Sequence, residues 1–506
     1  MESNLGRTLT LKSSRMLLSM IVASMLSLLT SIVSARSLGA TFLGLYAIIA
    51  SVQSIVFLFA EFGLGTAIPK LIAENRIRNP SQAMSLAKVG FYLVISFSVI
   101  SSIIYVLISY PIGVWLYGNP LITELIPLSA LAVISGALLL FVSAIAQGCQ
   151  NIRILARSKI SVAALMFILV LLLVPSLGIV GLFLSSIFTQ IAISLIIFRA
   201  IDRAKFNFTS AKVQTDPRHA KNLIVFAFPS MLSAAFVGPI FWFGTTELAL
   251  IVDLQAVGYF AISLAFYQML ILIPQSIVIP LMPTISELSA GSSSGLKPFI
   301  ERTLNRLSFF LFIPMVIVLV FSDSFVSILY GSDYSSASDI VSLMSIAAYL
   351  SALSAISGAV LIGMSRIWSG LALNAIWALV FVTFILALIP TLGIIGLGIT
   401  YSVSYGILFF ASSFLMVRKY GLNLNKTYKR ITLVLFLLLM FYLLRHYFAS
   451  IGIFEQALLI VICIASLIAL LHTSRSEILT GIRYLRYMLL ELAHRKFKLF
   501  HETRKN

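Results

Sequence analysis

Long apolar segments fill most of the chain, and polar residues gather in the short stretches between them. A helix that crosses a bilayer needs about 20 mostly apolar residues. Segments of this length recur without the apolar–polar alternation of membrane β-strands, so the pattern predicts spanning helices rather than a barrel. We expect fourteen, at residues 15–35, 43–66, 88–109, 121–147, 159–175, 178–198, 222–249, 255–281, 305–322, 338–362, 367–389, 393–417, 430–448 and 452–471.

Composition strengthens this prediction. Hydrophobic residues make up 60% of the 506 residues and charged residues 10%, whereas an ordinary soluble chain has about 25% charged residues. The mean hydropathy is +1.06. So few charges cannot cover a soluble surface, so we expect an all-α polytopic membrane protein. The net charge of +18 therefore does not indicate a nucleic-acid partner.

The positions of the basic residues predict the orientation. With fourteen spans, 33 of the 35 Lys and Arg residues fall on one side of the membrane, and only Arg36 and Arg445 fall on the other. Loops rich in Lys and Arg face the cytoplasm. We therefore expect both termini to be cytoplasmic, in a multi-pass protein of the cell (plasma) membrane.

Short motifs recur at an offset of 213 to 215 residues, which indicates an internal duplication. The matched landmarks are Val174–Leu182 with Ile389–Leu397, Leu116–Gly118 with Leu329–Gly331, Gly44–Ala47 with Gly258–Ala261, and Pro69 with Pro283. This offset contains six spans, and an even number preserves orientation. We expect two parallel six-helix repeats around a central cleft, as in transporters.

The duplication divides the chain into four parts. We expect an N-lobe at 1–210 with spans 1–6, a C-lobe at 211–420 with spans 7–12, and two extra helices within 421–474. Residues 475–506 form the fourth part. They carry apolar residues at helical spacing among many basic ones, which is typical of an amphipathic cytoplasmic helix on an anionic membrane surface. A helix that binds a partner protein is the alternative.

The same landmarks carry a family resemblance. Ala35–Gly39 followed by Phe42–Tyr46 resembles the opening signature of the polysaccharide-transporter family, and Glu61–Ala67 resembles its next motif. Further matches are Phe228-Pro229, Val257–Tyr259, Leu329–Tyr334 and both Pro-x-Leu-Gly-Ile-x-Gly turns. The chain thus resembles the lipid-linked oligosaccharide flippases of the multidrug/oligosaccharidyl-lipid/polysaccharide exporter superfamily over about residues 10–420.

This resemblance implies a function. The family moves an undecaprenyl- or dolichyl-(pyro)phosphate-linked oligosaccharide to the outer leaflet by alternating access, for polysaccharide or glycoprotein biosynthesis. We expect a monomer that binds membrane lipid and this substrate, with Na⁺ or H⁺ as the coupling ion. A cation-coupled multidrug-type antiporter of the same superfamily is the alternative. A membrane-embedded glycan polymerase or ligase is more remote, because the loops are short and no P-loop motif is present.

An anionic lipid headgroup needs cationic partners. Arg15 opens span 1, Lys88 opens span 3 and Arg36 ends span 1, so these three are candidates for the headgroup. Alternatively they anchor the helices at the interface, with their long side chains extended toward water.

Acidic and amide side chains inside spans are the candidates for the cavity. Glu61 lies in span 2 and Glu247 near the outer end of span 7. An acid within a span is a functional candidate, although a local ion pair between Glu61 and Arg15 would also explain it. Gln53, Gln147 and Gln190 are among the polar residues that either line the cavity or bond between helices.

Prolines inside spans are candidates for gates. Pro229 and Pro239 fall in span 7, and Pro274 and Pro280 fall in span 8. Proline removes a backbone hydrogen bond and favours a kink, which serves either a moving gate or static packing. The five histidines and two cysteines show no metal-ligand spacing, so we expect no metal, no cofactor and no enzymatic activity.

Overall fold

The computed structural model describes residues 2–76, 79–203, 217–290, 296–363, 367–421 and 423–448. The regular structure of this part is helical. The elements are α1 (Glu2–Glu61), α2 (Leu64–Asn75), α3 (Pro80–Leu107), the π-helix η1 (Pro111–Leu116), α4 (Pro120–Gly148), α5 (Ile152–Arg203), α6 (Pro217–Ile251), α7 (Leu254–Ala290), α8 (Leu296–Val320), α9 (Ser322–Leu329), the 3-10 helix η2 (Ser332–Ala337), α10 (Ser338–Gly363), α11 (Ile367–Tyr420) and α12 (Asn425–Phe448).

Eight helices in the described ranges are long and apolar enough to cross a membrane, or nine if α8 and α9 form one span bent by 69°. This confirms a multi-pass helical membrane protein. The exact count of fourteen spans stays a prediction, and the last of them, 452–471, lies outside the described residues together with the basic tail.

Two glycines turn the long helices α5 and α11 back on themselves. Gly178 has φ 56° and ψ −133°, and Gly393 has φ 56° and ψ −132°, values that only glycine adopts readily. A Cβ atom on Gly181 would lie 2.5 Å from the carbonyl oxygen of Leu173, and one on Gly396 would lie 2.4 Å from that of Leu388. Eight residues of straight helix span about 12 Å. Each helix is therefore a hairpin, with its turn at the predicted Pro-x-Leu-Gly motif.

The helix that carries Glu61 ends earlier than the sequence pattern suggested. The predicted second span runs to residue 66, but Phe62 (φ 48°) and Gly63 (φ 73°) leave the helical region and α2 begins only at Leu64. Apolar periodicity continues across this break, so the pattern alone does not reveal it. Glu61 is therefore the last residue of α1 rather than an interior one.

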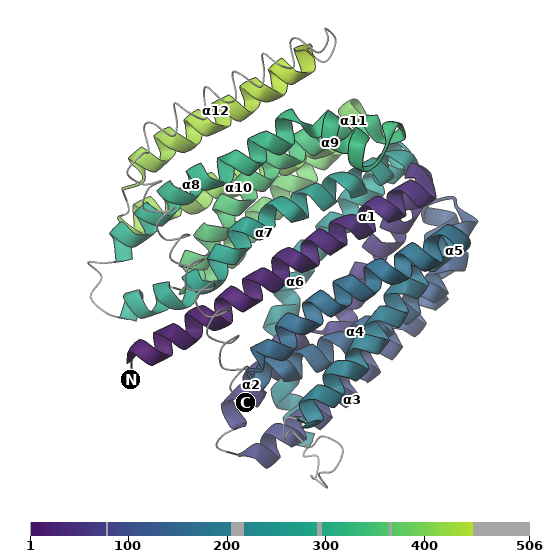
Figure 1. The fold of residues 1–506 in the computed structure, drawn as a ribbon, viewed down its shortest axis with the longest axis vertical. Helices are drawn as coiled ribbons and strands as arrows, with labels where there is room; N and C mark the ends of the chain where they lie inside the picture. Colours follow the sequence, from purple (N-terminus) through teal and green to yellow (C-terminus); the bar gives the residue numbers. More distant parts are fainter. Residues whose placement is uncertain are drawn as a thin grey trace, which may run out of the picture.

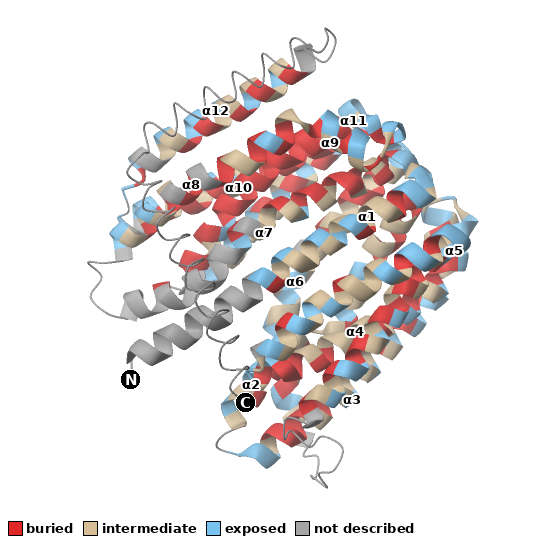
Figure 2. Cartoon of the chain, viewed as in Figure 1, coloured by how far each residue is buried: buried red, intermediate tan, exposed pale blue. Residues whose placement is uncertain are grey.

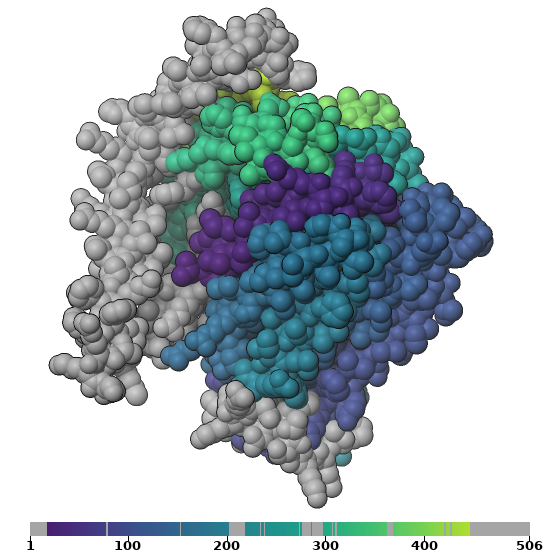
Figure 3. Space-filling model, turned by 45° about the vertical axis from the view of Figure 1, so that its right-hand side comes forward, coloured from purple at the N-terminus to yellow at the C-terminus, as the bar shows by residue number. Residues whose placement is uncertain are grey.

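Helices α1–α5 form the first half of the bundle and α6–α11 the second, and α1 lies where the two halves meet. It packs against α3, α4 and α5 on one side and against α6 and α7 on the other. Figure 1 shows the N-terminal helices α3–α5 in blue on one side of α1 and the teal and green helices α7–α11 on the other. The space-filling view in Figure 3 likewise shows the purple surface of α1 between the blue and green surfaces.

Burial differs sharply between helices, as the colours in Figure 2 show. In α10, 94% of the most apolar stretch is buried, whereas in α11 the share is 17%. Large apolar side chains are exposed on the outside, among them Leu107, Leu379 and Trp368. Apolar exposure on this scale fits a surface that faces lipid rather than water.

A buried ion-pair group holds α12 against the second half. Arg445 on α12 is only 5% exposed. Its guanidinium donates to Asp323 on α9 at 2.6 and 2.9 Å and to Asp339 on α10 at 2.8 Å. Bidentate pairing of this kind fixes geometry as well as charge. This group adds to the apolar packing of α12, in which Val434, Leu438 and Phe441 are buried.

Candidate functional site

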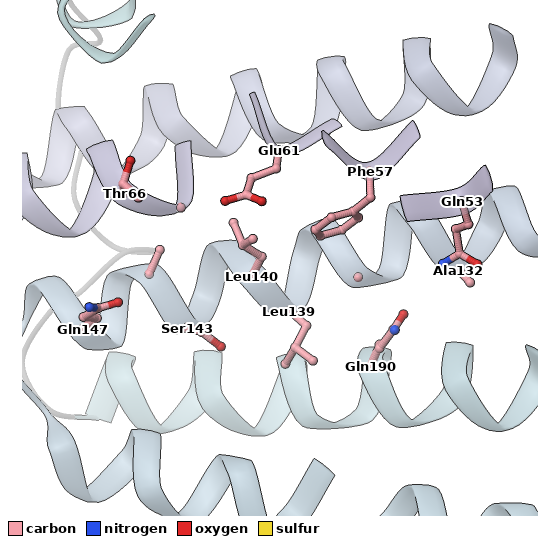
Figure 4. A pocket seen from close by; sticks show the side chains of 13 residues that line it. Gln53, Phe57, Glu61, Thr66, Ala132, Leu139, Leu140, Ser143, Gln147 and Gln190 are labelled. Carbon is pink, nitrogen blue, oxygen red and sulfur yellow. The ribbon is translucent and has the colours of Figure 1, made fainter. Parts of the chain in front are cut away.

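One cavity lies inside the first half of the bundle, between α1, α2, α4 and α5 (Figure 4). Its volume is about 480 Å³. In Figure 4 the side chains of Gln147, Ser143 and Gln190 lie across the cavity from Glu61 and Phe57. The full lining is Gln53, Phe57, Glu61, Gly65, Thr66, Ala132, Gly136, Leu139, Leu140, Ser143, Ala144, Gln147 and Gln190. We call this the N-terminal cavity.

A second cavity of about 600 Å³ lies between α1 of the first half and α6 of the second. We call it the interlobe cavity, and it is lined by Ser54, Phe57, Leu58, Glu61, Ser230, Ala234 and Gly238. Phe57 and Glu61 line both cavities. These two residues therefore form a shared wall.

The local backbone explains the position of the Glu61 carboxylate. A Cβ atom at Gly65 would lie 2.5 Å from Glu61 Oε1, so the glycine leaves the space that the carboxylate occupies. Glu61 is half-buried, and within the described part of the chain no hydrogen bond or ion pair to it is found. A carboxylate in an apolar surrounding is costly unless it has a partner. The position is thus suited to a donor or a cation from a ligand.

Contacts between the halves flank the interlobe cavity along α6. Near Glu61, a Cβ atom on Gly63 would lie 2.2 Å from the carbonyl oxygen of Ala227, and Thr66 donates to Ser230 Oγ at 2.9 Å. Toward the other end of α6, Thr246 and the Tyr117 hydroxyl share a hydrogen bond of 2.7 Å. Of the cavity residues on α6, Ser230 takes part in the first contact, and Ala234 and Gly238 lie between the two contacts in the sequence.

The contacts at the far end are reciprocal. Tyr117 of the first half bonds Thr246 of the second, and Tyr330 of the second half bonds Ser31 of the first at 3.2 Å. Tyr330 lies 213 residues after Tyr117, and Thr246 lies 215 after Ser31. The proposed repeat therefore relates the two hydrogen bonds: in each, a tyrosine of one half bonds a hydroxyl side chain of the other half, at equivalent positions.

The close approach of α1 and α7 shows the same symmetry between the two halves. A Cβ atom on Gly44 would lie 1.8 Å from the carbonyl oxygen of Leu254, and one on Gly258 would lie 2.0 Å from that of Ala40. Both pairs are again related by an offset of 214. Any side chain at either glycine would separate the two backbones.

Arg36 also lies where the two halves meet, against α9, rather than on the wall of either cavity. Its Nε donates to the carbonyl oxygen of Leu329 at 2.8 Å, and its Nη2 donates to that of Ile328 at 2.6 Å. Nearby, Tyr334 donates to the carbonyl oxygen of Ala35 at 2.6 Å. The guanidinium thus meets the last carbonyls of α9, where a cation is favoured.

The other predicted charged residues lie apart. Lys88 is half-buried on α3, and Glu247 is half-buried near the end of α6. Neither is among the residues that line the two cavities. Arg15 belongs to α1, but its side chain lies outside the described part, so its pairing with Glu61 stays a prediction.

The predicted prolines lie within α6 and α7. Helix α6 continues through Pro229, which is exposed, and Pro239, which is half-buried. Pro274 is buried within α7, and Pro280 belongs to the same helix although its side chain is not described. In the described structure, positive φ angles occur at Phe62, at Gln150 and at glycines, and not at these prolines. A gating role for the prolines stays a prediction.

Of the amides noted in the sequence, Gln53, Gln147 and Gln190 come together in the N-terminal cavity. The hydroxyl contacts between the halves and the group formed by Arg445, Asp323 and Asp339 were not predicted. The sequence held one indication of the Arg445 group. With fourteen spans, Arg445 is one of two basic residues predicted on the side of the membrane where acidic residues collect. Within the described ranges, no group of three His, Cys, Asp or Glu residues could hold a metal ion.

Solved structures share this fold. The lipid II flippase MurJ in its inward closed conformation is 15% identical, with a TM-score of 0.70, and the match covers 91% of this chain and 99% of that one. An inward-facing multidrug resistance transporter of the MATE family is 16% identical, with a TM-score of 0.67, over 79% and 96% of the chains. The MATE transporter VcmN of Vibrio cholerae is 16% identical, with a TM-score of 0.63, over 83% and 98%.

The sequence comparisons give the family. No curated protein matches this chain. A sequence profile described as polysaccharide biosynthesis protein matches residues 10–289, more than half of the chain. The chain therefore belongs to the polysaccharide biosynthesis protein family, within a fold shared by MurJ and the MATE transporters.

Proposed function

We propose that this protein is a flippase that moves a polyprenyl-(pyro)phosphate-linked oligosaccharide from the cytoplasmic to the outer leaflet of the cell membrane by alternating access. The observation that supports this proposal most strongly is the interlobe cavity. It lies between α1 and α6, has Glu61 in its wall, and is flanked along α6 by contacts between the two halves. A cavity of this kind opens to either side when one set of contacts breaks.

The two halves act as parallel repeats in this proposal. The equal backbone angles at Gly178 and Gly393, and the reciprocal contacts of Gly44 and Gly258, support it. The charge distribution supports an outer position for the Arg36 contacts. The present conformation would then be closed to the outside. Alternating access requires the contacts between the halves at this end to break together. Because the repeat relates these contacts in pairs, one movement of the halves would break both members of a pair.

The substrate would enter the interlobe cavity from the cytoplasmic side, its polyprenyl chain remaining in lipid. Arg15 and Lys88 would meet the phosphate on entry, and Arg36 would become free to do so once its bonds to α9 break. Arginine provides a planar set of donors suited to phosphate. Na⁺ or H⁺ would bind at Glu61 or Glu247 as the coupling ion, and the lobes at 1–210 and 211–420 would move around this site.

The test is deletion of the protein in its source cells. Loss of a flippase should lower surface polysaccharide and make polyprenyl-linked oligosaccharide accumulate on the cytoplasmic leaflet, where added glycosidase reaches it only in inverted vesicles. The control is the same deletion carrying the wild-type chain on a plasmid. Normal surface glycan in the deletion, together with raised sensitivity to lipophilic cations, would instead favour the multidrug antiporter that the MATE-like fold also allows.

A further inference from the structure

We propose that the N-terminal cavity is a saccharide-binding subsite that holds a sugar of the transported glycan beside the interlobe cavity. The proposal rests on the proposed flippase function, and it goes further because it assigns a separate pocket to the glycan. The residues that carry it are Gln53, Gln147, Gln190 and Glu61, with the ring of Phe57.

The cavity has polar side chains in its lining although it lies inside a membrane-embedded half. Three glutamines, a glutamate, Ser143 and Thr66 face one space of about 480 Å³. Polar groups within the bilayer are costly, so they concentrate where water or a polar substrate enters. The volume lies in the range of about 300–1,000 Å³ that small-molecule sites occupy.

Neighbouring serines orient two of the amides. Ser129 donates to Gln53 Oε1 at 2.9 Å, and Ser135 donates to Gln190 Oε1 at 2.5 Å. An amide oxygen that accepts from the protein leaves the amide N–H groups as donors for a ligand. Gln190 uses one of its N–H groups on Ser186 at 3.0 Å, and the amide carries a second.

Glu61 supplies the acceptor on the opposite wall. Glu61 is the last residue of α1, and its carboxylate occupies the space left by Gly65, across the cavity from Gln147 and Gln190. Amide donors and a carboxylate acceptor around one cavity match the hydroxyl groups of a sugar, each of which both donates and accepts. The ring of Phe57 lies beside Glu61 in the lining and offers an apolar face for the C–H side of a pyranose.

Other occupants fit less well. A cation site surrounds the ion with oxygens at about 2.0–2.6 Å, whereas this space is many times larger than one ion. A polyprenyl chain would leave the amides and the carboxylate unpaired. Since Phe57 and Glu61 also line the interlobe cavity, a sugar in the N-terminal cavity stays next to a phosphate in the cleft.

The test uses full-length protein in detergent with Cys149→Ser, Cys463→Ser and Ser143→Cys, so that one thiol reports on the cavity. The probe is the oligosaccharide released by mild acid from the lipid-linked pool of the deletion cells. We expect it to protect this thiol from maleimide. Adding Gln147→Leu should raise the half-protecting concentration about two- to tenfold, the loss expected for one hydrogen bond. The control Gln268→Leu, an exposed glutamine on α7, should leave it unchanged.

A second variant guards against misfolding. Gly136→Ala places a methyl group 3.2 Å from Phe57 Cε2 and 3.6 Å from Gln190 Oε1, and should weaken protection without removing a polar group. Equal protection in all variants, or no protection by the oligosaccharide, would overturn the proposal. Flipping of the intact lipid by wild-type protein, measured in parallel, tests the proposed function separately. Transport without any protection refutes only the saccharide site, whereas protection without transport refutes only the flippase.

Discussion

Removing the Arg36 side chain should weaken the contact between the halves at one end. Arg36→Ala deletes two charge-assisted hydrogen bonds, to the carbonyls of Leu329 and Ile328. Each such bond contributes about 1.5–3 kcal/mol when shielded from water. Arg36 is exposed, so about 1–3 kcal/mol for the pair is the appropriate range. Because 1.4 kcal/mol is a factor of ten, the ratio of closed to open conformers should fall about 5- to 140-fold.

Pulsed electron–electron distance measurements can follow this shift. Spin labels at Ser37 and Ser335, both exposed, report on the two sides of the contact. In a background with Cys149→Ser and Cys463→Ser, Arg36→Ala should add a population at longer distance, and Arg36→Lys should add less of it.

A matched control and a second assay complete this test. Arg157→Ala removes an exposed arginine from α5 and should leave the distance distribution unchanged. Glycan export should fall with Arg36→Ala at equal protein level. Reduced export with an unaltered distance distribution would refute the gate reasoning and leave Arg36 as a headgroup ligand only.

Three further predictions follow from the described contacts. Arg445→Ala leaves two half-exposed acids without their partner and should destabilise the detergent-solubilised protein by about 1–2 kcal/mol, seen as a lower melting temperature; an unchanged melting temperature would contradict a stabilising role for this group. Gly178→Ala and Gly393→Ala should each cost about 1–3 kcal/mol, since both turns use the same glycine-only backbone, and a tolerated alanine at one alone would argue against equivalent turns. Reporter fusions at Asp333 and Pro217 should fall on opposite sides of the membrane, and the same side for both would reject the fourteen-span topology.

Local sequence patterns account for much of the fold. The first thirteen predicted spans fall in described helices, and both Pro-x-Leu-Gly motifs form turns, because apolar periodicity and glycine act over a few residues. The sequence pattern did not predict the break after Glu61. Phe62 adopts a positive φ there, which is uncommon for a residue other than glycine.

The candidate site depends on contacts that sequence spacing does not encode. Glu61 was identified because an acid in an apolar segment is costly, and the structure places it in the walls of two cavities. Arg36 was expected at a headgroup, but its guanidinium meets carbonyls almost 300 residues away. Such partners arise from helix packing, which one sequence without its fold does not reveal.

The most direct test of the central claim is transport by the purified protein. Lipid-linked oligosaccharide from the deletion cells would be reconstituted with the full-length chain in liposomes, and access of an external glycosidase would be followed after the outer leaflet has first been digested. The account predicts that wild-type protein renews the digestible pool, whereas Glu61→Gln does so more slowly and protein-free liposomes do not. Renewal at the protein-free rate in wild-type liposomes, under imposed Na⁺ and H⁺ gradients, would contradict the flippase function.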